Sequence, residues 1–323
     1  MALGPWHAFG WRTATGDTPL RVDGYGPLVD KGDLWLPPEF NYQIISWQGK
    51  LMSDGRPTPG IFDGMGAFPI SSPRDRPGTT RTILIRNHEN REIGGEQRVV
   101  TNTELEYDSM AMGGNTKLVV DRRPTKQRDP ETGRRLFEYE VVEDFAILGG
   151  TSTNCAGGEL PFKKWVTCEE VVKRSPNGMK HGYLFEIDAR APGVVPAVPV
   201  LAAGRMAHEA IAARNGILYL TEDRGLEGDS LLGTIGACFY RYLPDSRMRR
   251  SQNLAFSGGR LQALKLRDEF HANMDSGRTV GAQYKVDWVT IDEPDHDDDT
   301  DQRRDRAPGF TPTRIQAQDK GAA

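Results

Sequence analysis

The fold prediction starts from one stretch of the chain, Asn154-Cys155-Ala156-Gly157-Gly158-Glu159-Leu160-Pro161-Phe162-Lys163-Lys164-Trp165-Val166-Thr167-Cys168-Glu169-Glu170. Glycine allows positive φ and close backbone approach, so the paired glycines favour a tight turn that turns Cys155 toward a ligand. The run 164–168 is typical of a strand, and it leads to two adjacent carboxylates. A thiolate and carboxylates that converge suit a metal ion. The alternative is a glycine turn before a buried strand, with Cys168 as a small core residue.

Composition favours a β-rich protein. The chain has 323 residues, enough for one large β domain or two ordinary ones, and its 36 glycines and 21 prolines predict many turns and few long helices. The net charge is −4 and the basic residues are dispersed, which speaks against a nucleic-acid surface. No segment approaches the length of apolar sequence that a membrane-spanning helix needs.

The cysteines do not form a disulfide framework. There are three, Cys155, Cys168 and Cys238, and an odd, low count is untypical of paired cysteines. Cys238 lies in the strand-like run 237–242, which predicts a core position. Cys155 is therefore the cysteine expected to bind a metal.

Two candidate carboxylates precede the central stretch. Alternation of Phe40, Tyr42 and Ile44 predicts a strand over 40–46, and the glycine-rich segment 49–65 predicts a loop. Asp63 in that loop would either bind a cation or cap a turn. A strand over 80–86 ends in Asn87-His88-Glu89, a polar triad where a propeller or barrel presents ligands, although a lone histidine such as His88 is more often structural. Further strands are predicted at 116–121, 137–148, 182–188, 239–242, 261–266 and 286–291, with an exposed loop at 122–135.

The clearest hairpin turns at Asn215-Gly216, the preferred pair for a type I′ turn. Glu209 lies six residues before Asn215, and Glu222 lies six residues after Gly216. The two carboxylates should therefore occupy the same open end of the hairpin. They form either a cation site facing a central channel or an ordinary charge pair at a sheet edge.

These motifs resemble the PhoX-type alkaline phosphatase family, formerly a family of unknown function. Its hallmark resembles residues 154–170 almost continuously, except that Phe162-Lys163 stands where the family usually has Trp-Gly. The resemblance extends to further segments of this chain, Gly24-Tyr25-Gly26-Pro27-Leu28, Asp63-Gly64-Met65, Asn87-His88-Glu89, His208-Glu209 and Thr221-Glu222-Asp223.

The resemblance implies an all-β fold, a β-propeller that is incomplete here. We expect an irregular segment over 1–33 and a partial propeller over 34–323, corresponding to roughly the first two-thirds of a full family member. The acidic stretch 292–301 lacks the spacing and glycine of an EF-hand and is expected to be a solvated loop rather than a calcium site.

The resemblance also implies a cluster of calcium and iron in the central channel. Carboxylate oxygens suit Ca²⁺, and a thiolate suits iron. The implied ligands are Cys155, Glu170 and Glu209, with Glu89, Glu169, Glu222, Asp223 and Asp63 as further candidates.

The function implied is a metal-dependent phosphatase that hydrolyses phosphate monoesters and takes a small-molecule phosphate ester as its partner. We expect the activity to be impaired in a partial chain. The main alternative is a calcium-stabilised β-propeller binding module without turnover. A propeller lactonase is a third reading, against which Cys155 argues because Ca²⁺ does not seek sulfur. Family members are periplasmic or secreted, whereas the first 21 residues carry no apolar core of signal type, which would leave this chain in the cytoplasm if its start is correct.

Overall fold

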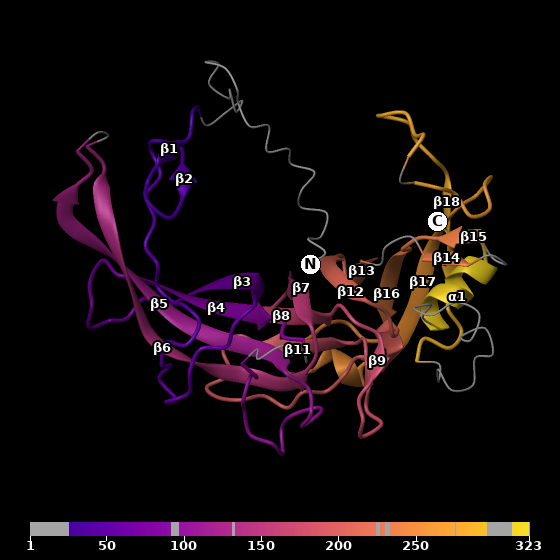
Figure 1. Cartoon of the computed structure of the whole chain (residues 1–323), viewed down its shortest axis with the longest axis horizontal. Helices are drawn as coiled ribbons and strands as arrows, with labels where there is room; N and C mark the ends of the chain where they lie inside the picture. The colour runs from indigo at the N-terminus through magenta and orange to yellow at the C-terminus, as the bar shows by residue number, and fades with distance from the viewer. Residues whose placement is uncertain are drawn as a thin grey trace. The chain divides into compact units, whose positions relative to one another are not determined.

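The computed structural model of the chain describes residues 26–91, 97–130, 133–223, 227–229, 233–274, 276–295 and 312–322. The chain forms two compact units, one of residues 1–44 with 125–138 and one of residues 45–124 with 139–323. In the smaller unit, β1 (Val29–Asp30) pairs with β2 (Trp35–Leu36). Strands dominate the described residues, so the prediction of an all-β fold is confirmed (Figure 1).

A four-stranded antiparallel sheet comes first in the larger unit, and the tips of its last two strands belong to the smaller unit. Its strands in spatial order are β3 (Phe62–Ile70), β4 (Thr80–His88), β5 (Gly113–Arg128) and β6 (Arg135–Thr151). Two sequence predictions are wrong here. Residues 62–65 begin a strand instead of ending a loop, because the neighbouring strand β4 supplies hydrogen-bond partners despite the glycines. The predicted loop 122–135 instead continues both strands of a long hairpin, since β5 runs on to Arg128 and β6 begins at Arg135.

The predicted strand over 40–46 is also wrong, since these residues adopt no regular secondary structure. Their side chains alternate in polarity as a strand would, but Phe40 and Ile44 remain exposed at 49 % and 55 %. A strand is stabilised by a neighbouring strand and a buried face, and this segment lacks the buried face.

A three-stranded sheet follows and contains the central stretch. It has the order β11 (Leu184–Asp188), β8 (Lys164–Glu169) and β7 (Asn154–Leu160). Successive side chains on these strands enter different cores, as the two-residue period of a strand requires. Trp165 packs in one hydrophobic cluster and Val166 in the other, and Phe185 and Leu184 divide in the same way. The sheet is therefore covered on both faces.

The third sheet has five antiparallel strands. In spatial order they are β12 (His208–Arg214), β13 (Ile217–Glu222), β16 (Phe239–Pro244), β17 (Gly259–Leu266) and β18 (Val286–Thr290). Asn215 and Gly216 join β12 to β13 with φ angles of 52° and 81°, the positive values that a type I′ turn requires. The predicted hairpin is confirmed.

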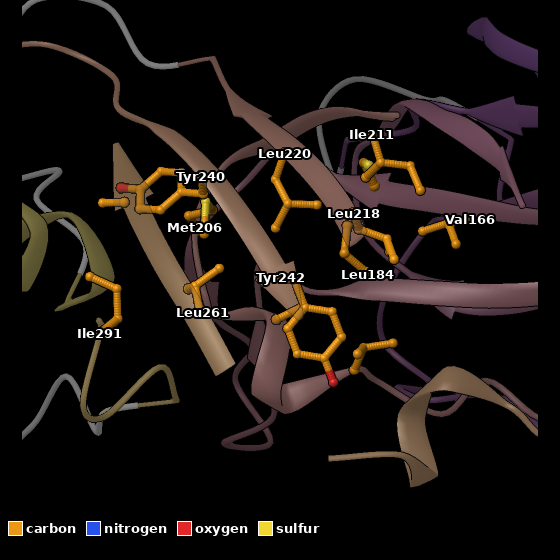
Figure 2. Packing of buried hydrophobic residues seen from close by; sticks show 14 of the residues in the cluster. Val166, Leu184, Met206, Ile211, Leu218, Leu220, Tyr240, Tyr242, Leu261 and Ile291 are labelled. Carbon is orange, nitrogen blue, oxygen red and sulfur yellow. The ribbon is translucent and has the colours of Figure 1, made fainter. Parts of the chain in front are cut away.

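Two hydrophobic clusters join the three sheets. One lies between the first and second sheets, where Ile83, Ile85 and Ile147 meet Trp165 and Phe185. The other lies between the second and third sheets and is shown in Figure 2, with these labelled members: Val166, Leu184, Met206, Ile211, Leu218, Leu220, Tyr240, Tyr242, Leu261 and Ile291. The clusters fix the three sheets face to face, so their corresponding strand ends can contribute to one site.

The remaining elements are short. They are β9 (Lys173–Arg174), β10 (Lys180–His181), β14 (Glu227–Asp229), β15 (Gly233–Ile235), the 3₁₀ turns η2 (Leu201–Ala203) and η3 (Leu254–Phe256), and the helix α1 (Pro312–Asp319). No helix within the described residues has the length and apolar character needed to cross a membrane.

Candidate metal centre

Three hairpins, one from each sheet, repeat the same local geometry at one end. They are β3–β4, β7–β8 and β12–β13. Each begins with an antiparallel residue pair and then shifts register, so that the entering strand gains one residue relative to its partner. The three first pairs are Phe62↔His88, Asn154↔Glu169 and His208↔Glu222, and pairing resumes at Met65, Gly157 and Ile211.

The extra residue makes a β-bulge, a feature that re-aims a side chain out of the regular alternation. The first bulge residue is a potential metal ligand in all three hairpins, namely Asp63, Cys155 and Glu209. The bulges therefore turn one carboxylate or thiol from each sheet away from the strand pattern.

The exit strands repeat as well. The residue immediately after each exit strand is acidic, and its backbone N–H donates to the carbonyl of the residue just before the entering strand. The three bonds run from Glu89 to Ile61 at 3.0 Å, from Glu170 to Thr153 at 2.9 Å, and from Asp223 to Ala207 at 3.1 Å. Each hairpin thus presents two candidate ligands at a fixed backbone position. The sequence shows no such repeat, because the residues involved differ in type.

Five of these six side chains form a cluster around Cys155. Its thiol lies 3.4 Å from the Asp63 carboxylate and 3.6 Å and 3.7 Å from the two oxygens of Glu209. The potential ligand atoms form two groups, each within 4.8 Å: Asp63, Glu89 and Cys155, and Cys155, Glu170 and Glu209. Cys155 belongs to both groups and is 9 % exposed.

The cluster carries an excess of negative charge. Burial, together with the charges of the four neighbouring carboxylates, raises the pKa of the Cys155 thiol far above its ordinary value. Burial and the charges of Glu209 and Glu89 raise the pKa of Glu170 to about 7, and burial followed by the charge of Asp223 raises that of Glu209. Like charges that converge in a partly buried site favour a bound cation. The donor set fits a site with both oxygen and sulfur ligands.

Glycines allow the bulge of Cys155 to pack against its neighbours. A Cβ atom on Gly157 would lie 1.9 Å from the Val166 carbonyl, and one on Gly64 would lie 2.7 Å from the Ala156 Cα. Neither position can hold a larger residue without moving backbone. Gly64 and Gly157 thus have packing roles. The tight turn predicted at Gly157-Gly158 is wrong, because both residues lie within β7 and the chain turns at residues 161–163 instead.

Glu169 lies outside the cluster. Its side chain is buried, and its two oxygens accept hydrogen bonds from three backbone N–H groups, those of Ser152 at 2.8 Å, Gly182 at 2.7 Å and Tyr183 at 3.0 Å. His181 Nδ1 donates to the same carboxylate, and His181 Nε2 contacts Asp108. With carboxylates on both ring nitrogens, the histidine is held as an imidazolium. Glu169 therefore ties β8 to the chain around β10.

Glu222 also points elsewhere, although it shares the open end of its hairpin with Glu209. Its carboxylate accepts from Arg314 Nε at 3.0 Å, and from the Cys238 backbone N–H and the Tyr240 hydroxyl at 3.3 Å each. The structure thus places these two glutamates on different faces, because the bulge at Glu209 changes its orientation relative to the paired His208–Glu222 position. Asp223 completes the acidic set by its charge near Glu209 and Glu170.

The other sequence candidates have structural surroundings. Cys168 and Cys238 lie in the hydrophobic core. His88 binds the Gly60 carbonyl and the Thr116 hydroxyl, both at 2.8 Å, and its burial lowers its pKa to about 3, so it is a satisfied neutral histidine. Residues 296–301 of the acidic stretch lie outside the described part of the chain.

Comparison with known proteins places these features in context. The family model described as alkaline phosphatase PhoX matches residues 23–323, which is nearly the whole chain. Searches of curated proteins and of solved structures each found no match.

Proposed function

Because the chain belongs to the alkaline phosphatase PhoX family, we propose that it is a metal-dependent phosphatase that hydrolyses small-molecule phosphate monoesters with calcium and iron as its metals. Phosphatase chemistry and a phosphate ester substrate follow from the family. The choice of calcium and iron is supported by the donor types in the cluster around Cys155.

The single observation that carries the proposal is the position of Cys155. Its thiol is shared by two groups of ligand atoms, one with Asp63 and Glu89 and the other with Glu170 and Glu209. Oxygen donors suit a hard cation such as Ca²⁺, whereas sulfur suits a transition metal such as iron. A site that binds only calcium would not place a buried thiol among its ligands, because Ca²⁺ prefers oxygen donors.

The bound metals would offset the charge of the phosphoryl oxygens and polarise the ester for attack by water. The residues of the chain supply the remaining requirements. Glu170 and Glu209 provide carboxylates from neighbouring sheets, and their backbone positions are fixed by the hairpin geometry. Burial of Cys155 limits water around the thiol.

We further propose that the three stacked sheets are blades of a β-propeller. The support is the repeated hairpin geometry, which brings the same end of each sheet to one cluster. A periplasmic or secreted location is a proposal by family resemblance, and cell fractionation with an antibody to the native protein tests it.

Metal analysis with an activity assay tests the proposed function. We expect purified protein to contain both iron and calcium, and to hydrolyse a generic aryl phosphate monoester only when the metals are present. Calcium without iron, and no turnover after both metals are supplied, would contradict the phosphatase and favour a calcium-stabilised binding module.

A further inference from the structure

We infer that Asn87 is a positioning residue for the metal centre, because its carboxamide clamps the bulge that carries Cys155. The inference rests on the proposed metal-binding role of Cys155. Asn87 lies on β4 in the first sheet, and the bulge lies on β7 in the second. The side chain therefore joins two sheets that contribute different ligands.

The clamp consists of two hydrogen bonds from one nitrogen. Asn87 Nδ2 donates to the carbonyl of Cys155 at 2.6 Å and to that of Ala156 at 2.7 Å. The register of β7 with β8 passes from Asn154 to Gly157, so these two residues have no partner in the ladder. Asn87 supplies hydrogen bonds where the sheet does not.

The orientation of the carboxamide is fixed by its other contacts. Trp165 Nε1 donates to Asn87 Oδ1 at 2.9 Å, and Asn115 Nδ2 donates to the same oxygen. An indole nitrogen can only donate and a carbonyl oxygen can only accept. The oxygen of Asn87 must therefore face Trp165, and its nitrogen must face the bulge. The whole carboxamide is buried and both of its ends are satisfied.

The position of the clamp links it to metal geometry. Glu89 follows Asn87 by two residues, and Asp63 lies on the adjacent strand of the same sheet. Asp63 and Glu89 form one ligand group with Cys155, whereas Glu170 and Glu209 form the other with it. By holding the Cys155 backbone to the first sheet, Asn87 sets the distance of the thiol from Asp63 and Glu89. Metal sites lose affinity when ligands are free to move, and residues that orient ligands typically contribute about 10–100-fold.

The test uses Asn87→Asp, which keeps the shape and the acceptor for Trp165 but removes both donors to the bulge, and Asn87→Ser, which adds no charge. Asn253→Asp is the matched chemical control, since the Asn253 carboxamide oxygen accepts a hydrogen bond from the Ala255 N–H and aspartate can accept the same bond. Leu261→Ala, in the core, is the control for lost stability. Co²⁺ is the probe, because its thiolate complex has an intense charge-transfer absorption that reports the Co–S bond directly.

We expect both Asn87 variants to bind Co²⁺ at least about 10-fold more weakly, with a reduced thiolate band, while the two controls keep the wild-type band. In metal-free protein, iodoacetamide should alkylate Cys155 several-fold faster in Asn87→Ser, which adds no negative charge beside the thiol, than in the controls, as followed by peptide mass spectrometry. Folded Asn87 variants with a wild-type band and a wild-type alkylation rate would overturn the inference. If wild-type protein itself shows no thiolate band, the proposed metal centre fails, and the alkylation rates alone decide whether Asn87 holds the bulge.

Discussion

The substitution Glu169→Gln separates the two carboxylates that the sequence places side by side. In the structure one oxygen of Glu169 accepts from the Ser152 N–H and His181, and the other accepts from the Gly182 and Tyr183 N–H groups. Glutamine has a single acceptor oxygen, so one of these pairs would face an NH₂ group. Two buried donors would lose their acceptor at about 1–3 kcal/mol each, a loss of roughly 2–6 kcal/mol in the free energy of unfolding.

Urea unfolding of the metal-free protein measures this loss without interference from bound ions. Glu159→Gln is the matched control, because Glu159 lies on β7, is exposed and accepts one hydrogen bond from the Ala67 N–H that glutamine can also accept. We expect its free energy of unfolding to stay within about 0.5 kcal/mol of wild type. A Glu169→Gln variant as stable as this control, yet depleted of metal, would refute the structural role and return Glu169 to the ligand set.

Three further predictions concern stability and metal binding. Burial opposes the charged form of His181, but the charge and hydrogen bond of Glu169, with the hydrogen bond of Asp108, raise its pKa above the ordinary value of 6.5. The imidazolium therefore contributes stability that is complete below about pH 6.5 and is lost as the pH rises through the raised pKa. In urea titrations His181→Gln should therefore lower the free energy of unfolding more at pH 6 than at pH 9. An equal loss at both pH values would contradict this. Gly157→Ala should lower the free energy of unfolding by about 3 kcal/mol or more, because the added Cβ meets the Val166 carbonyl. Gly193→Ala is the control and should change stability little, because open space surrounds Gly193. Similar melting temperatures for the two variants would count against the packing of the bulge. Asp223→Asn should weaken Co²⁺ binding by about 10-fold in an absorbance titration, and Glu222→Gln should not. The reverse order would mean that Glu222, and not Asp223, belongs to the ligand set.

Local sequence rules predicted the strands and hairpins well. Asn215-Gly216 identified its turn because the type I′ geometry demands positive φ, and Glu209 and Glu222 followed at the same open end by counting along two paired strands. Counting could not show that the two side chains face different ways. One extra residue in the β-bulge changes the orientation of every side chain beyond it, and bulges have no reliable signature in a single sequence.

Long-range contacts account for what the sequence left open. Glu222 accepts a hydrogen bond from Arg314, which lies on α1 and is 92 residues away in sequence. Asn87 donates to a backbone carbonyl that is 68 residues away. The segment around Asp63 was predicted as a loop because of its glycines. It forms a strand because it pairs with β4, a contact that the local sequence does not reveal. The repeated hairpin geometry could not be recognised in the sequence, because the equivalent positions of the three hairpins hold aspartate, cysteine and glutamate.

The metal content of Cys155→Ser shows directly whether Cys155 binds iron. Wild-type protein, Cys155→Ser and the core control Cys238→Ser would be prepared together, and their iron and calcium measured by elemental mass spectrometry. We expect iron in wild type and in Cys238→Ser, and loss of iron from Cys155→Ser in a protein that still folds. Equal iron content in all three proteins would contradict the assignment of Cys155 as the ligand that joins the two halves of the centre.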